Sequence, residues 1–194
     1  MYKMISMASL FGLIAFSGPV LGDAATQIPI CAGCHGADGA SSPMPDVPII
    51  AGIDALVQED ALFAYRDGGN ECWPPGLMCQ IAASLTDDDI VGLSAHFAAL
   101  PFKPAGEDFD AALAAEGEEA HENSCGMCHG MHAPDDPASS ILHGQRIAYL
   151  RAAIQQYATG KREQQPAMQA MIDALTPEQT EAILNYYASY RETP

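Results

Sequence analysis

The sequence predicts an all-α protein built from two similar tandem halves. Apolar residues recur with helical spacing in the chain of 194 residues, and no convincing strand alternation is found. A short run of cysteines and histidine occurs twice, as Cys31-Ala32-Gly33-Cys34-His35 and as Cys125-Gly126-Met127-Cys128-His129. Superposing the two runs at an offset of 94 residues brings the rest of the halves into register with small slips. The chain is therefore interpreted as an internal duplication of one helical unit.

Each of these runs has the residue types and the spacing that attach haem to a chain covalently. Two thiols separated by two residues can bond to the two vinyl groups of one haem, and the next residue places an imidazole beside the iron. The sequence therefore predicts two covalently bound haem c groups. The first is attached at Cys31 and Cys34 with His35 on its iron, and the second at Cys125 and Cys128 with His129.

Two other uses of a C-x-x-C pair fit the sequence less well. A thioredoxin-like dithiol would be expected within a βαβ pattern, which the sequence does not show. A zinc site could combine both cysteine pairs, but about 90 residues separate them, far more than in a zinc ribbon. Covalent haem explains the histidine after each second cysteine, which neither alternative requires.

The first 22 residues have the pattern of an export signal. Lys3 precedes an apolar run over residues 4–16, which residues 17–19 interrupt before small residues that suit a signal peptidase. The apolar run is short for a membrane span, although a retained anchor is the alternative. We expect cleavage after Gly22, no stable membrane span after cleavage, and a periplasmic location.

The mature chain is strongly acidic. Without residues 1–22 it holds 7 basic against 25 acidic residues, a formal net charge of −18. Residues 23–102 contribute −10 of this charge and residues 103–194 contribute −8. Nucleic acid and anionic membrane surfaces are therefore poor partners. The surplus of acids serves solubility or steers the protein towards a partner with a basic docking face, and the sequence leaves both explanations open.

The duplication divides the mature chain into two domains and a linker. We expect a first haem domain over residues 23–100, a linker over residues 101–106 that is rich in proline, and a second haem domain over residues 107–194. Each domain has about 85 residues and three helices or fewer, which gives a thin core for an independent unit. The haem is therefore expected to supply part of the apolar interior.

Residues that align between the halves mark the ends of the expected helices. Glycines bracket one helix in each half and align as Gly52 with Gly144 and Gly68 with Gly160. Thr86 aligns with Thr176, and acids follow both threonines, so each is expected to cap a final helix.

The leading helices of the two halves are expected to differ. Residues 109–122 are expected to form the first helix of the second half. In the first half few residues precede Cys31, and Pro29 interrupts them, so a shortened or frayed leading helix is expected there.

The sixth ligand of each iron is expected to be a methionine. Met78 lies seven residues before Leu85, and Met168 lies seven residues before the aligned Leu175. A thioether on a loop before the last helix suits the iron of an electron-carrying haem and raises its potential. Met171 is the main rival in the second half. Three methionines near the attachment segments have no aligned counterpart and are interpreted as packing: Met44, Met127 and Met131.

The remaining histidines do not align with one another across the duplication. If two of them were ligands, the irons would be bis-histidine and of lower potential. Surface or packing roles are favoured for all of them, namely His96, His121, His132 and His143.

The turn before Gly52 is expected to orient the first histidine ligand. Pro48 stands where a backbone carbonyl can accept the second N–H of that ring. Ser140 takes the aligned position in the second half, and its carbonyl could serve there because a backbone acceptor does not depend on the side chain.

Cys72 and Cys79 are the cysteines left over. In an exported protein a disulfide is favoured, and this one would close a small loop that holds Met78. Two free thiols or a metal pair are the alternatives.

With these residues assigned, nearly the whole mature chain resembles the diheme cytochromes c of the cytochrome c4 type. The stretch from Pro104 to Cys125, together with Met78 and Ile81, is most similar to the haem subunit of flavocytochrome c sulfide dehydrogenase. The resemblance implies two cytochrome c domains related by a pseudo-two-fold axis, with the haems facing across the interface. It also implies a flavin-carrying partner chain that oxidises sulfide.

Three functions are therefore weighed. The first is transfer of electrons as the haem subunit that accepts them from a flavoprotein sulfide dehydrogenase. The second is a free cytochrome c4-like carrier to a terminal oxidase or another redox partner. The third is a diheme enzyme of the peroxidase or thiosulfate-oxidising type, which needs an open or unusually ligated iron. The two aligned methionines favour a non-catalytic electron-transfer role, and no catalytic residues are assigned.

We predict that the mature protein consists of residues 23–194 with two haem additions, because each half has its own attachment run. Intact-protein mass spectrometry checks both points. A single haem addition, or a mass that still includes residues 1–22, would contradict this prediction.

Overall fold

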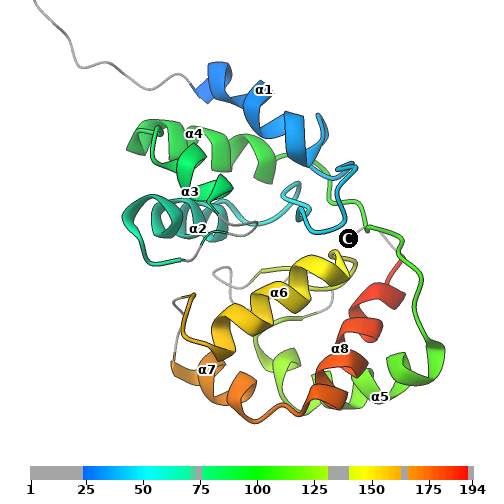
Figure 1. Cartoon of the computed structure of the whole chain (residues 1–194). Coiled ribbons are helices and arrows are strands. Elements are labelled where there is room, and N and C mark those ends of the chain that lie inside the picture. Colours follow the sequence, from blue (N-terminus) through cyan, green and yellow to red (C-terminus); the bar gives the residue numbers. More distant parts are fainter. Residues whose placement is uncertain (1–23, 71, 73–75, 131–139, 163–165, 192–194) are drawn as a thin grey trace, which may run out of the picture.

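The computed structural model describes residues 24–70, 72, 76–130, 140–162 and 166–191, and it is helical in both halves (Figure 1). The predicted signal peptide lies outside these residues. The helices of the first half are α1 (Ala24–His35), α2 (Ala55–Asp67), α3 (Leu77–Ala82) and α4 (Asp87–Ala98). Those of the second half are α5 (Ala111–Glu122), the short 3₁₀ helix η1 (Cys125–Met127), α6 (Ile147–Ala158), α7 (Pro166–Asp173) and α8 (Pro177–Ser189). The described residues contain no strand beyond an isolated antiparallel bridge between Asn70 and Arg162, which confirms the all-α prediction.

The core of the first half forms where α1 crosses α4. Ala24, Ile28 and Cys31 lie on one face of α1, three to four residues apart, and pack against a buried cluster. That cluster consists of Leu85, Ile90, Leu93 and Phe97. The prediction of a shortened or frayed leading helix is therefore wrong, because α1 has 12 residues with Pro29 inside it. Proline costs a helix one backbone hydrogen bond, and the packing of this face against α4 compensates for it.

The equivalent crossing in the second half joins α5 to α8. A Cβ atom at Gly117 would lie 2.1 Å from the carbonyl oxygen of Ala182, so the two backbones approach more closely than any side chain allows. Leu150 of α6 joins the core on α8, which includes Ile183, Leu184 and Tyr187.

Both threonine caps are confirmed. Thr86 and Thr176 each accept a hydrogen bond from the backbone three residues ahead, where Asp89 and Gln179 bond back to the threonine N–H. Gly68 ends α2 in the left-handed conformation with a φ of 91°, as its alignment with a helix end predicted.

The expectation of three helices or fewer in each half is wrong. The segments before the two capping threonines, which were expected to be loops, contain the helices α3 and α7. They have 6 and 8 residues, and segments this short show little periodicity in the sequence.

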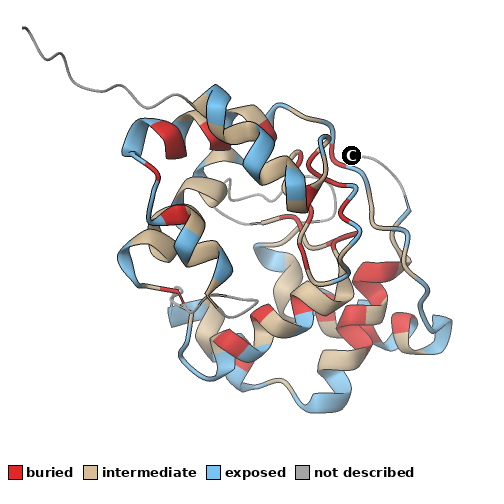
Figure 2. Ribbon diagram, turned by 45° about the horizontal axis from the view of Figure 1, so that its top comes forward, coloured by how far each residue is buried: buried red, intermediate tan, exposed pale blue. Residues whose placement is uncertain are grey.

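One buried side chain of the second half bonds to the backbone of the first half. Gln145 of the second half is 3% exposed and lies against Ile49 of the first. Its Oε1 accepts from the Ile49 N–H at 2.8 Å, and its Nε2 donates to the Ile49 carbonyl at 2.8 Å. Arg146 adds hydrogen bonds to the carbonyls of Ala40 and Ser42. Figure 2 shows buried residues on α8 and also on the loop segments between the helices.

Among the described residues, no helix is both long enough and apolar enough to cross a membrane.

We predict that Gln145→Ala lowers the free energy of unfolding by about 2–4 kcal/mol, because it leaves a buried N–H and a buried carbonyl of Ile49 without partners. Denaturant unfolding of the haem-loaded protein measures this loss. Gln155→Ala, the same change at an exposed position on α6, is the control and is expected to stay within about 0.5 kcal/mol of the unchanged protein. Equal losses of unfolding free energy in the two variants would contradict the predicted contribution of the Gln145 contact to stability.

Candidate haem sites

The first site lies at the C-terminal end of α1. Cys31, Cys34 and His35 end this helix and line a pocket of about 460 Å³, part of which is open to solvent. Asp46 is the one acidic residue in the lining, and the apolar lining comes from Ile30, Val47, Pro48, Leu77, Met78 and Ile81. An apolar pocket that carries two thiols, an imidazole and a thioether fits a haem attached through its vinyl groups and bound axially by nitrogen and sulfur.

The structure favours the neutral form of His35, the form that can bind a metal. His35 is 7% exposed, and its Nδ1 lies 2.9 Å from the carbonyl oxygen of Pro48. The carbonyl can only accept, so Nδ1 carries the proton and Nε2 keeps its lone pair for a metal. Burial lowers the pKa of His35 and so favours this neutral form, although the bond to Pro48 opposes the shift. The expected acceptor at Pro48 is confirmed.

The second site is built on a turn instead of a helix. The 3₁₀ helix η1 carries Cys125, and the N–H groups of Cys128 and His129 both donate to the Cys125 carbonyl. Nδ1 of His129 lies 2.9 Å from the carbonyl oxygen of Ser140, which confirms that a serine can replace proline at this acceptor.

The methionines expected as sixth ligands lie near the starts of two short helices. Met78 is the second residue of α3 and lines the first pocket together with both cysteines and His35. Met168 is half-buried on α7, whereas its rival Met171 is 41% exposed. The exposure favours Met168, and both ligand assignments stay predictions.

A buried polar cluster distinguishes the second site from the first. His121 is 5% exposed, and its Nδ1 lies 3.0 Å from the hydroxyl of Tyr187, which also contacts Cys125. Burial raises the pKa of Tyr187 well above its ordinary value and lowers that of His121. The ring of His143, 1% exposed, stacks edge-on against His121 with centroids 4.9 Å apart.

These contacts assign His121 and His143 to packing, one of the two roles expected for them. His132 lies outside the described residues. The contact of His121 with Tyr187 joins residues 66 positions apart, so no local pattern in the sequence predicts it. The aligned positions in the first half are Gln27 and Phe97, so this cluster has no counterpart there.

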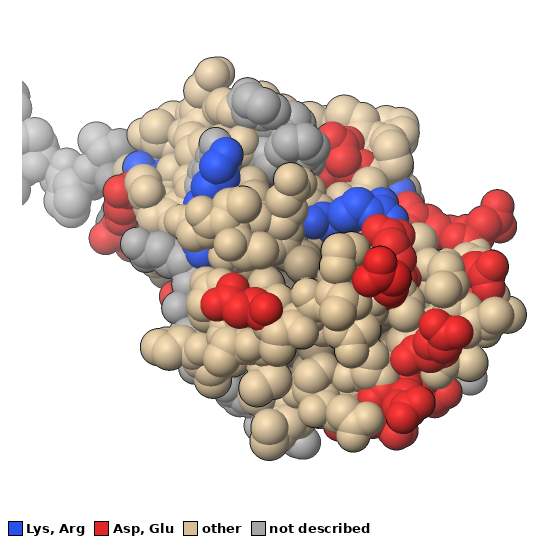
Figure 3. All heavy atoms as spheres, turned by 60° about the horizontal axis from the view of Figure 1, so that its bottom comes forward, with Lys and Arg blue, Asp and Glu red and all other residues tan. Residues whose placement is uncertain are grey.

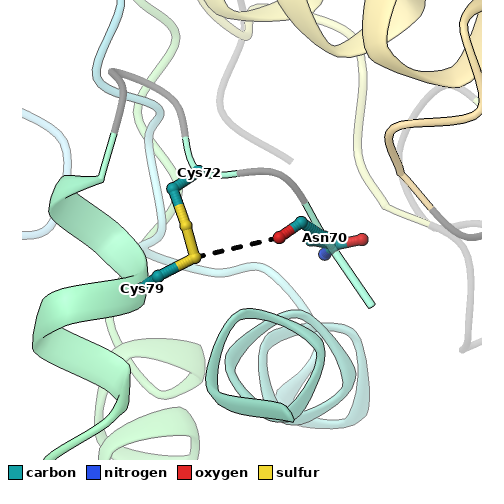
Figure 4. The surroundings of a disulfide bond; sticks show 3 residues. All are labelled: Asn70, Cys72 and Cys79. Carbon is teal, nitrogen blue, oxygen red and sulfur yellow. Dashed lines mark hydrogen bonds between the residues drawn. A yellow bond between two sulfur atoms is a disulfide. The ribbon is translucent and has the colours of Figure 1, made fainter. Parts of the chain in front are cut away.

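The two remaining cysteines form a disulfide next to Met78. Cys72 and Cys79 are joined, with their Cα atoms 5.7 Å apart, and Figure 4 shows the bond beside α3. The four cysteines of the two attachment runs carry no disulfide. This leaves their thiols available for attachment to haem.

Comparisons with known proteins agree with this chemistry. Residues 112–186 match the family described as cytochrome C oxidase, cbb3-type, subunit III. A thiosulfate dehydrogenase electron acceptor from Stutzerimonas stutzeri is 31% identical over 171 residues, which cover 82% of this chain and 78% of the relative. A cytochrome c4 structure from Acidithiobacillus ferrooxidans is 26% identical with a TM-score of 0.72, and the match covers 82% of this chain and 97% of the other.

The chain belongs to the cytochrome c4-like family of diheme c-type cytochromes. This cytochrome therefore binds two covalently attached haem c groups and carries electrons. It is also similar to a thiosulfate dehydrogenase (TsdBA) from Marichromatium purpuratum, with 28% identity and a TM-score of 0.69. That match covers 84% of this cytochrome but 36% of the other chain. The comparisons do not support a specific link to sulfide dehydrogenase.

We predict that Met168→Ala lowers the potential of the second haem by on the order of 0.1 V, because a thioether ligand raises the potential of haem iron. Met171→Ala, a matched change one helical turn along α7, is expected to leave both potentials unchanged. Redox titration of the purified variants separates the two cases. If the potential of the second haem falls only in the Met171 variant, the alignment of the two halves is wrong by one helical turn.

Proposed function

We propose that this cytochrome accepts electrons from a dehydrogenase that oxidises thiosulfate, and passes them to a further redox protein. The observation that carries the proposal is its similarity to a thiosulfate dehydrogenase electron acceptor over about four-fifths of both chains. The likeness to part of a thiosulfate dehydrogenase chain supports the same class of donor.

The residues of both sites suit electron transfer without bond chemistry. When bound, each haem supplies a one-electron iron couple. His35 and His129 are fixed through backbone carbonyls, so their rings need not reorient when the charge at the iron changes. Met78 and Met168, proposed as the sixth ligands, would close both irons to substrates. This arrangement favours a carrier over a diheme peroxidase or a thiosulfate-oxidising enzyme.

We propose export to the periplasm as the setting of this reaction. The signal pattern over residues 1–22 supports this setting, as does the disulfide between Cys72 and Cys79, because disulfides persist in oxidising compartments.

A second candidate donor is a flavoprotein sulfide dehydrogenase. The stretch from Pro104 to Cys125 favours it through its resemblance to the haem subunit of such an enzyme. In that case the cytochrome would be a tightly bound subunit. A free cytochrome c4-like carrier to a terminal oxidase is the outcome expected if neither dehydrogenase reduces it.

The net charge predicts how the donor is recognised. Acidic side chains outnumber Lys and Arg on the face shown in Figure 3. A donor with a basic docking face would therefore be attracted, and salt would screen that attraction beyond about 8 Å at physiological ionic strength.

We predict rapid reduction of the oxidised cytochrome by thiosulfate in the presence of a thiosulfate dehydrogenase, with a rate that falls as salt is added. Stopped-flow absorbance of the haems measures the rate, and thiosulfate without the enzyme is the control. A sulfide-oxidising flavoprotein is tested in parallel with sulfide. Reduction by the flavoprotein alone, or recovery of a stable flavin complex from the native host, would replace the thiosulfate proposal with the sulfide one.

A further inference from the structure

The two methionine-bearing helices are anchored by different means. In the first half Cys79 directly follows Met78 on α3, and its disulfide to Cys72 ties the first turn of this helix to the chain before it (Figure 4). The sulfur of Cys79 also lies 3.8 Å from the carbonyl oxygen of Asn70.

Among the described residues, the first turn of α3 has no side-chain cap. The helix has 6 residues, and its N-cap is Gly76, with a φ of 85° and no side-chain capping bond. No acidic residue stands in its first turn to favour the helix dipole. Helices this short are unstable without tertiary restraints, so the position of Met78 depends on what α3 is attached to.

The other end of the disulfide lies beside a well-fixed segment. Asn70 is 7% exposed, and its N–H donates to the Ala64 carbonyl of α2 at 3.1 Å. Asn70 also pairs with Arg162 of the second half. Through Cys72, two residues further on, the disulfide therefore links Met78 to α2 and to the contact between the halves.

The second half uses non-covalent contacts at the aligned positions. At an offset of 90 residues, Gln169 stands where the first half has Cys79, and its Nε2 donates to Asp173 within α7 at 2.7 Å. Arg162 stands where the first half has Cys72. Its Nη1 donates to the Tyr149 hydroxyl at 3.3 Å, and its guanidinium lies 5.0 Å from the ring centroid of Tyr157.

We propose that the Cys72–Cys79 disulfide is the positioning element that keeps Met78 at the first haem iron, and that opening it releases Met78 while the second site is unaffected. The proposal rests on Met78 being the sixth ligand. An external dithiol would open the bond: the disulfide takes up two electrons and two protons to give two thiols, and the dithiol is oxidised to its own disulfide. Both cysteines are half-buried, so neither residue is fully enclosed.

The test compares loss of methionine ligation at the two haems as pH is raised. A disulfide that closes a loop of about eight residues restricts the released state, and its removal is expected to favour release by about 50-fold. In the oxidised Cys72→Ser/Cys79→Ser variant, one haem should therefore lose its methionine–iron charge-transfer absorbance at a pH about 1.7 units lower than in the unchanged protein. The other haem should titrate unchanged.

Gln169→Ala is the matched control, because it removes the aligned side chain of the second half without breaking a covalent bond. It is expected to leave the first haem unchanged. No shift in the double serine variant, or an equal shift at both haems, would overturn the proposal. If that variant fails to acquire haem, reduction of the intact protein with dithiothreitol, alkylation of the thiols and reoxidation of the irons with ferricyanide give the same species for titration.

Met78→Ala separates this proposal from the proposed function. Loss of half the charge-transfer absorbance in this variant supports Met78 as the ligand. Full retention of the absorbance overturns the ligand assignment and the positioning role together. Reduction by thiosulfate and its dehydrogenase is a separate measurement, so the proposed electron donor can stand or fall independently.

Discussion

The hydrogen bond from the histidine of each attachment run to a backbone carbonyl constrains much of this structure. His35 bonds to Pro48 and His129 to Ser140, and the residue after each acceptor, Ile49 or Ile141, packs into one shared buried cluster. Ile49 is also the residue whose N–H and carbonyl bond to the side chain of Gln145. The loops that orient the two histidines thus also take part in the contact between the halves, so a shift between the halves would reach both rings.

Duplication has preserved this constraint while the surroundings have diverged. At the crossing of the first and last helices of each half, Gly92 of α4 faces Ala24 of α1, whereas in the second half Gly117 is on the leading helix and faces Ala182 of α8. Each crossing needs one residue without a side chain, and either helix can supply it. The methionine helices show the same freedom, since a disulfide ties α3 to the chain before it, whereas α7 packs against α6.

The sequence could predict what depends on short spacing or recurs in both halves. The attachment runs, the threonine caps and the carbonyl acceptors are of this kind, because each is defined by a few neighbouring residues and can be checked against its aligned copy. The helix α3 was not predicted because six residues show too little periodicity. The full length of α1 was not predicted because its packing against α4 compensates for the hydrogen bond that Pro29 removes. The contact of Gln145 with Ile49 spans 96 positions and exists only once, so neither local pattern nor duplication pointed to it.

The contacts of the basic residues show why little of the acidic surface charge is neutralised within the protein. Arg66, Lys103 and Arg151 form ion pairs with neighbouring carboxylates. Three further arginines donate to backbone carbonyls or to a tyrosine hydroxyl, namely Arg146, Arg162 and Arg191. The chain has 25 acidic residues against 8 Lys and Arg residues, so its own cations are too few to neutralise most of its carboxylates. A redox partner that brings its own basic groups would therefore meet acids whose charge this protein has not already neutralised.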